Sequence, residues 1–172
     1  MKILHTADWH LGKKLDRFSR IEEQRAVMGE IVQIADAQKV DVVIIAGDLF
    51  DNFTPNTDAI ELFYKTVKQL SLGGRRPVVA ISGNHDAPKL IDAPDPLARE
   101  CGIFLIGQPF ALVTPIETQD FKITHSSAGF IELQLASFPY PLRIIHTAYA
   151  NEPRLREELE GDKQLAINQF LS

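Results

Sequence analysis

Apolar residues in the first half of the chain fall into short unbroken runs, separated by longer stretches in which apolar residues recur every three to four positions. The unbroken runs cover residues 1–5, 40–46 and 77–82 and are typical of strands covered on both faces of a sheet. The stretches between them, 21–38 and 55–72, have the spacing of amphipathic helices. This alternation predicts an α/β fold built on a parallel sheet with right-handed crossovers.

The pattern is weaker in the second half of the chain. Prolines at 88, 94 and 96 indicate a loop, and residues 97–101 are expected to form a short helix. Four short apolar runs are expected to form strands of a second sheet packed on the first, at 103–106, 111–113, 121–124 and 130–135. A last helix is predicted from Pro153, a residue type suited to the first helical turn.

The composition is that of one globular domain, 1–172, with 45% hydrophobic residues. A formal net charge of −5 argues against binding nucleic acid through overall positive charge, but not against an enzyme that meets phosphates through metal ions and a local basic patch. Cys101 is the single cysteine and is expected to be a small buried residue, which favours a reducing, cytoplasmic location. No apolar run approaches the ~18–20 residues of a membrane span, so no membrane association is expected.

Polar motifs follow directly after each of the three predicted strands. They are Asp8-Trp9-His10, Gly47-Asp48 and Gly83-Asn84-His85-Asp86. The carboxyl ends of parallel strands share one edge of a sheet, so these motifs are expected to meet there. Carboxylate, imidazole and amide ligands suit Mn²⁺, Fe²⁺ or Mg²⁺, and the lack of thiolates argues against structural zinc. Two such ions, bridged by Asp48, would activate a water and neutralise phosphate charge.

Residues near these motifs have competing interpretations. His85 is predicted to contact a phosphate or to protonate a leaving oxygen, with Asp86 orienting it. Trp9 is assigned to the core rather than to a lid beside the metals. His5 is interpreted as a packed histidine rather than a ligand, and His125 as a surface residue.

A basic cluster follows the first motif. Its members, which are candidates for contacts with backbone phosphates, are Lys13, Lys14, Arg17 and Arg20. The alternative interpretation of the cluster is a solvated loop.

The series DWH, GDLFD and GNHD resembles that of the calcineurin-like metallophosphoesterases. The longer segments ILHTADWHLGKKL, VVIIAGDLFDNFTP and SGNHDAP are similar to one branch, the SbcD-type DNA repair nucleases, as is SFPYPLR. The resemblance covers most of the first hundred residues. It implies the α-β-β-α sandwich of metallophosphoesterases, incomplete in this chain.

The resemblance also implies a role for each motif residue. Asp8 and His10 would hold one Mn²⁺ ion, Asp48 would bridge to a second held by Asn84, and His85 would act in catalysis. Family members cut DNA phosphodiesters, as exonucleases on double-stranded ends and as endonucleases on single strands and hairpins. They act in repair, recombination and replication with an SbcC-type ATPase, as homodimers, which implies a nucleoid-associated location.

The chain departs from the family pattern after the third motif. The family carries later histidines, including a Gly-His-x-His, whereas only His125 and His146 follow His85 here. His146 is not expected to be a ligand, because the corresponding family histidine follows a helix such as the one predicted from Pro153. The chain is therefore interpreted as the N-terminal portion of a longer nuclease, inactive or nearly so by itself. Asp51 is expected to hold the turn after the bridging residue.

Two other functions share these motifs. A small-molecule phosphodiesterase or phosphatase would use the same metal ligands, although His10-Leu11-Gly12 and the segment 49–52 favour the nuclease branch. A non-catalytic dimerisation module, formed by the helix at 21–38 or at 60–70, would carry a decayed site. The intact residue types of the early site argue against decay.

Overall fold

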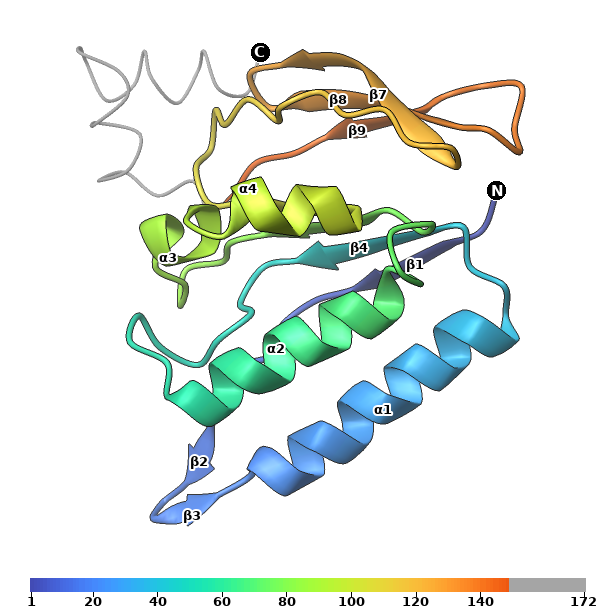
Figure 1. Ribbon diagram of the computed structural model, residues 1–172. Helices are drawn as coiled ribbons and strands as arrows, with labels where there is room; N and C mark the ends of the chain where they lie inside the picture. The colour runs from blue at the N-terminus through green and yellow to red at the C-terminus, as the bar shows by residue number, and fades with distance from the viewer. Residues whose placement is uncertain (149–172) are drawn as a thin grey trace, which may run out of the picture.

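The computed structural model describes residues 1–148 and shows two sheets stacked face to face, with helices on the outer face of the first (Figure 1). The first sheet is entirely parallel, with the order β1-β4-β5-β6. Its strands are β1 (Ile3–Thr6), β4 (Val42–Ala46), β5 (Val78–Ile81) and β6 (Ile103–Ile106). The second sheet is antiparallel and contains β7 (Phe121–Ser127), β8 (Phe130–Leu135) and β9 (Leu142–Ile145).

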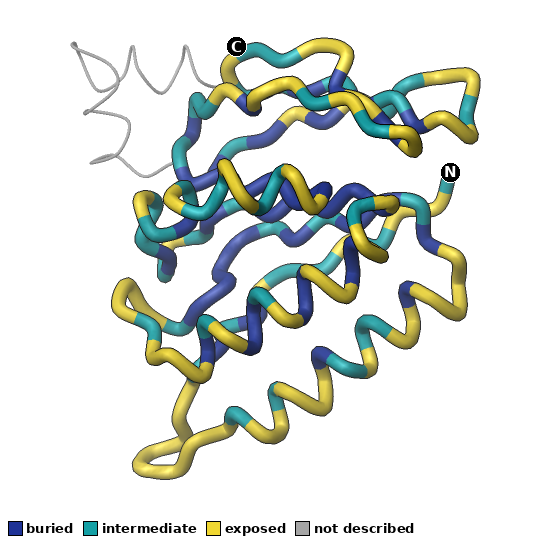
Figure 2. Tube along the Cα trace, viewed as in Figure 1, coloured by how far each residue is buried: buried dark blue, intermediate teal, exposed yellow. Residues whose placement is uncertain are grey.

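Both faces of β4 and β5 are covered, which explains their unbroken apolar sequences. Val43 and Val78 belong to a core shared with the helices α1 (Ile21–Ala37) and α2 (Thr57–Leu70). Their neighbours Val42 and Val79 point the other way, into a core shared with the second sheet. Successive side chains of a strand alternate between faces, so one short run serves two cores. Figure 2 shows this burial along the central strands.

The helices form where the apolar spacing predicted them. The N-cap of α2 is Asn56, whose side chain accepts a hydrogen bond of 2.9 Å from the amide of Ala59. Two further short helices, α3 (Pro88–Asp92) and α4 (Asp95–Ala98), pack near β6. The α3 segment was expected to be a loop, but proline is compatible with a first helical turn, where its missing N–H costs nothing. A 3-10 turn, Arg99–Cys101, completes the predicted short helix.

Several sequence predictions about position in the fold were wrong. The segment 103–106 joins the first sheet rather than the second, and 111–113 forms no strand. The first strand is an edge strand and is half exposed, so His5 is exposed rather than packed. Cys101 is exposed as well, because it ends the 3-10 turn at the surface. The helix predicted from Pro153 lies outside the described residues.

Together the described residues form three layers, one of helices and two of sheets, consistent with a metallophosphoesterase fold. A two-stranded hairpin, β2 (Lys14–Leu15) and β3 (Phe18–Ser19), projects from the loop after β1 and was not predicted. Within residues 1–148, no helix has both the length and the apolar character needed to cross a bilayer.

Candidate metal centre

The three motif loops meet at the carboxyl ends of β1, β4 and β5. One ligand atom from each of Asp8, His10 and Asp48 lies within 4.8 Å of the other two. The Nε2 atom of His10 is 3.7 Å from the Oδ2 atom of Asp48. A cavity of about 250 Å³ is lined by Asp8, Asp48, Asn84 and Thr147, among others. The fold thus brings together side chains that are up to 76 residues apart in sequence.

The loop backbone is held in an unfavourable conformation at three of these residues. The φ angles of Asp8, His10 and Asp48 are 56°, 43° and 48°. A left-handed conformation costs a non-glycine residue roughly 1–2 kcal/mol. It persists only where the surroundings impose it, and such residues cluster at functional sites. Here the loops fasten one another: the amide of Asp8 donates to the carbonyl of Gly47 at 3.1 Å, and that of His10 to Asp48 at 2.9 Å.

Two glycines permit this close approach, for different reasons. Gly47 has a φ of 87°, which a side chain would disfavour. Gly83 lies directly against the next loop, since a Cβ atom there would be 2.0 Å from the Oδ1 atom of Asp48 and 2.1 Å from its amide nitrogen. The glycine before Asn84 is therefore required by packing against Asp48.

Asn84 faces the carboxylate of Asp48. The terminal amide atom nearest to it is 3.1 Å from Oδ2 and 3.3 Å from Oδ1. If that atom is the nitrogen, the amide donates hydrogen bonds to Asp48. If it is the oxygen, the amide oxygen faces both oxygens of one carboxylate, a repulsive arrangement that a cation between them would relieve. Carboxylates, an imidazole and an amide oxygen make a donor set that fits a hard divalent cation.

His85 is fixed by the turn after β4. Its amide donates to the Oδ1 atom of Asp48 at 3.0 Å, and its Nδ1 atom is 2.8 Å from the carbonyl oxygen of Asp51. A carbonyl only accepts, so Nδ1 carries the proton in this contact. The ring lies nearly perpendicular to that of His10, with 4.9 Å between centroids. The backbone of Asp51 thus helps to orient the His85 ring.

Asp86 ties two of the loops together. Its buried carboxylate accepts hydrogen bonds from the amides of Leu49, Phe50 and Gly83, at 3.0, 2.8 and 2.7 Å. Burial raises the pKa of Asp86, and the nearby charge of Asp48 raises it further, while the three backbone donors lower it. This residue holds the second and third motifs in register.

Gln24, on α1, was missed by the sequence interpretation. Its Oε1 atom accepts from the amide of Gly12 at 2.9 Å, and its Nε2 atom donates to the carbonyl of His10 at 2.7 Å. The side chain therefore clamps the loop that carries Asp8 and His10 to the first helix. A glutamine within an amphipathic helix gives no sequence signal for such a contact.

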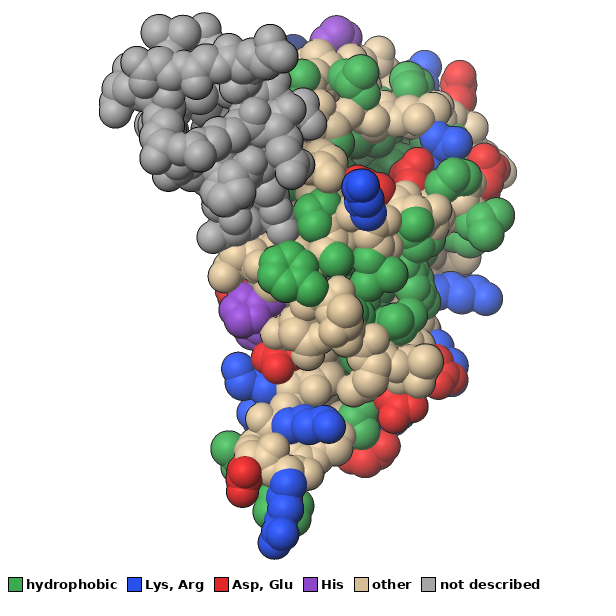
Figure 3. Space-filling model, turned by 90° about the vertical axis from the view of Figure 1, so that its left-hand side faces the viewer, with side chains coloured by type: hydrophobic (Ala, Val, Ile, Leu, Met, Phe, Trp, Pro, Cys, Tyr) green, Lys and Arg blue, Asp and Glu red, His purple; other side chains and the backbone are tan. Residues whose placement is uncertain are grey.

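The basic cluster lies in and around the β2–β3 hairpin, and Lys and Arg side chains gather toward the lower end of the face seen in Figure 3. Lys13 pairs with Asp51 at 3.5 Å, and Arg20 pairs with Glu23 at 2.8 Å. The Arg17 guanidinium lies 5.5 Å from the centroid of the Phe18 ring. Two of the four cations are thus already paired with carboxylates.

Three other predicted residues have clear positions. Trp9 is 7% exposed and packs edge-on against Phe63, which confirms its assignment to the core. His125 is exposed, as predicted. His146 is buried, neither of its ring nitrogens has a hydrogen-bond partner within residues 1–148, and burial lowers its pKa.

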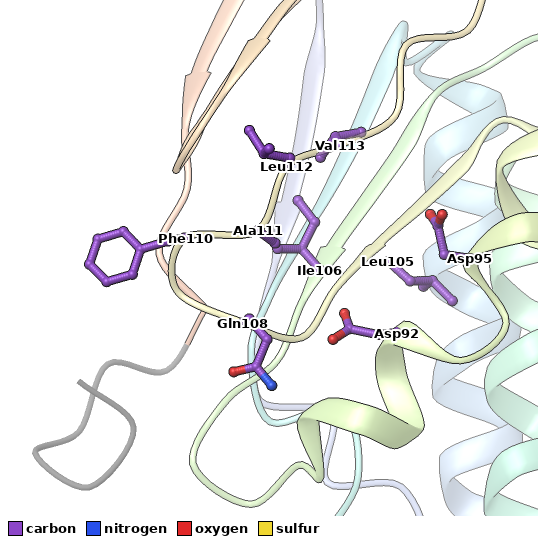
Figure 4. Close-up of a pocket in the computed structure, with 9 residues that line it drawn as sticks. All are labelled: Asp92, Asp95, Leu105, Ile106, Gln108, Phe110, Ala111, Leu112 and Val113. Carbon is purple, nitrogen blue, oxygen red and sulfur yellow. The ribbon is translucent and has the colours of Figure 1, made fainter. Parts of the chain in front are cut away.

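The structure has two further cavities, one beside the first motif and one away from the motifs. One, of about 350 Å³, lies between the first motif and α1, with Lys13 and Val27 in its lining. The other, of about 360 Å³, lies beside β6 (Figure 4). There Asp92 and Asp95 stand on one side and the segment 110–113 on the other, with the Phe110 ring turned away from the carboxylates. This second cavity contains none of the motif residues.

Comparison with known proteins places these features in a family. The model of the calcineurin-like phosphoesterase family matches residues 1–149. The chain is 42% identical over 159 residues to the D subunit of the SbcCD nuclease of Bacillus subtilis (strain 168), covering 92% of this chain and 36% of that protein. The proteins of the same name from Rhodobacter capsulatus and Staphylococcus saprophyticus are 39% and 41% identical over 108 and 92 residues. These alignments cover 62% and 54% of this chain and 27% and 24% of those proteins.

The chain therefore spans about a third or less of the length of these curated relatives. The family match nevertheless includes all three motif loops and both sheets. The chain belongs to the calcineurin-like phosphoesterase family.

Proposed function

We propose that this chain contributes metal ligands and a proton donor to the active site of a metal-dependent DNA nuclease subunit of the SbcD type. The observation that carries the proposal is the convergence of ligand atoms from Asp8, His10 and Asp48 within 4.8 Å, with Asn84 facing Asp48. The names of the relatives support a nuclease among the phosphoesterase activities.

In this proposal two divalent cations, Mn²⁺ first among them, supply an activated water and neutralise phosphate charge when bound. Asp8 and His10 would hold one ion, Asn84 would hold the other, and Asp48 would serve both. Gln24 and the neighbouring loop hold the strained backbone that carries Asp8 and His10.

His85 is the proposed proton donor. Because its Nδ1–H is donated to the carbonyl of Asp51, only Nε2 remains to meet the substrate. In the imidazolium form, Nε2–H can donate to a phosphate oxygen or to the leaving oxygen. Asp86 contributes by holding the loops of Asp48 and His85 together, rather than by touching substrate.

The proposed substrate is DNA, cut from double-stranded ends and within single strands and hairpins, at the nucleoid. The proposed partners are an SbcC-type ATPase and a second copy of the nuclease protein. Of the basic cluster, Lys14 and Arg17 are the better candidates for phosphate contacts, since Lys13 and Arg20 are paired with carboxylates. The 172-residue chain itself is expected to show little turnover, because the family's later histidines have no counterpart in it.

A chimera tests the proposal. This chain replaces the matching segment of the Bacillus subtilis protein, and the product is assayed with Mn²⁺ on hairpin DNA and on a chromogenic phosphodiester. The expected result is cleavage of DNA that Asp48→Asn reduces by at least ~10³-fold, since it removes the bridging charge. Turnover of the chromogenic diester without DNA cleavage would favour the small-molecule enzyme. Dimerisation with no hydrolysis and no Mn²⁺ binding would favour the interaction module.

A further inference from the structure

His10 lies between two carboxylates. Its Nε2 atom is 3.7 Å from the Oδ2 atom of Asp48, and its Nδ1 atom is 3.7 Å from the Oδ1 atom of Asp51. The first carboxylate belongs to the proposed metal ligands. The second lies on the opposite side of the ring, at the end of the GDLFD motif.

The Nδ1 atom of His10 is buried and has no hydrogen-bond partner within the described residues. A buried polar nitrogen left without a partner destabilises the fold, so an acceptor for it is expected nearby. A histidine that binds a metal through one nitrogen usually donates its other N–H to a carboxylate or carbonyl, which fixes the tautomer and the ring plane. The carboxylate of Asp51 is the acceptor that faces this nitrogen, and 3.7 Å is close enough for a small side-chain rotation to close the bond.

We propose that Asp51 is the positioning residue of this metal centre. Its carboxylate accepts the Nδ1–H of His10 and so directs Nε2 toward the metal that Asp8 and Asp48 share. The inference deepens the proposed function, since it assigns a residue to the same site. It also replaces the expectation that Asp51 only holds a turn.

The other contacts of Asp51 extend this role. Its carboxylate lies 3.5 Å from the Nζ atom of Lys13, and its carbonyl accepts the Nδ1–H of His85. Its amide donates to the carbonyl of Leu11 at 3.1 Å, which fixes the residue relative to the first loop. Asp51 thus orients three side chains: the proposed metal ligand His10, the proposed proton donor His85 and the exposed Lys13.

A competing role for the same carboxylate is direct ligation. Ligand atoms of His10, Asp51 and His85 also lie within 4.8 Å of one another and could hold an ion themselves. Against this, the Nδ1 atom of His85 is occupied by the Asp51 carbonyl, so His85 would have to turn its other nitrogen toward the ion. The two roles differ in which nitrogen of His10 meets the ion: Nε2, with the proton on Nδ1, if Asp51 positions the ring, and Nδ1, with the proton on Nε2, if Asp51 is itself a ligand beside it.

The test is nitrogen-15 NMR of the histidine side chains in the metal-free 172-residue chain, recorded at alkaline pH. The proposal predicts a proton on Nδ1 of His10 in the wild type, a mixed or reversed tautomer in Asp51→Ala, and a wild-type pattern in Asp58→Ala. Asp58 is a matched control because it is an exposed aspartate in the first turn of α2. A proton on Nε2 in the wild type, or an unchanged tautomer in Asp51→Ala, would overturn the proposal.

Mn²⁺ titration followed by electron paramagnetic resonance gives the second readout. Loss of a partner of this kind weakens metal binding by roughly 10–100-fold. Asp51→Ala is expected to fall in that range, and Asp51→Asn, which keeps an acceptor oxygen and the side-chain shape, to lose less. If Asp51→Ala does not fold, the tautomer and affinity of Asp51→Asn decide, with wild-type values for both counting against the proposal. Failure of the wild type to bind Mn²⁺ would instead contradict the proposed function. The two failures can be told apart because the tautomer is measured without metal.

Discussion

Removing the amide of Gln24 should weaken metal binding without touching any proposed ligand. Gln24→Ala deletes the hydrogen bonds to the amide of Gly12 and the carbonyl of His10. Each bond contributes about 0.5–1.5 kcal/mol, so the free energy of unfolding should fall by about 1–3 kcal/mol. The left-handed backbone at Asp8 and His10 would then lose one of its restraints.

The expected effect on metal affinity follows from that strain. If the released loop relaxes at one left-handed residue, the cation must restore roughly 1–2 kcal/mol on binding. Since 1.36 kcal/mol is a factor of ten, Mn²⁺ affinity should drop by about 5–30-fold. Calorimetric titration with Mn²⁺ measures the affinity, and urea unfolding measures the stability.

Gln33→Ala is the matched control, because Gln33 is an exposed glutamine on the same helix. It should leave both quantities within experimental error. A Gln24→Ala variant that loses stability but binds Mn²⁺ as tightly as the wild type would refute the reasoning, since the loop would then hold its shape without the clamp.

Three further predictions concern packing, pH and DNA. Gly83→Ala should lower the free energy of unfolding by about 3 kcal/mol or more and abolish metal binding, because the added Cβ would lie 2.0 Å from the Asp48 carboxylate. Its control is Gly29→Ala on α1, where the added Cβ enters open space and should raise the free energy of unfolding by about 0.5–1 kcal/mol. Thermal unfolding measures both. Burial raises the pKa of Asp92 in the folded state, so the wild type loses stability as pH rises through that pKa. The free energy of unfolding of Asp92→Asn, measured in urea, should therefore gain on that of the wild type from pH 4 to pH 7. A difference that stays constant with pH would contradict this. Charge reversal at Lys14 and Arg17 should weaken DNA binding and reduce the slope of log affinity against log salt concentration by roughly 0.7–0.9 per lost phosphate contact. An unchanged slope would show that the β2–β3 hairpin does not contact DNA phosphates.

The sequence predicted the fold correctly where the local apolar pattern and the order of the strands lead to the same arrangement. The unbroken apolar runs of β4 and β5 reflect burial on both faces, and the parallel order alone brings the residues that follow them to one edge. Position within the sheet was not available from the same pattern. The first run resembles the others, yet β1 lies at an edge, and His5 is exposed because the described residues provide no strand beyond it.

The residues that support the proposed site were harder to predict than the proposed ligands themselves. A motif identifies Asp48 or Asn84 by chemistry and spacing, whereas Gln24 and Asp86 act through hydrogen bonds to backbone groups of other loops. Those contacts depend on how the loops cross in three dimensions. Asp51 shows the same limit, since its distances to His10 and Lys13 arise only after the first and second loops pack together.

The most direct test of the shared metal site is a Mn²⁺ titration of this chain with Asp8→Asn and Asn84→Ala measured side by side. The two residues come from different loops, 76 positions apart, and Asp8 and Asn84 line one cavity. The wild type is expected to bind Mn²⁺ saturably, and either substitution should weaken that binding strongly. Binding that neither substitution alters would show that the ions sit elsewhere and would contradict it.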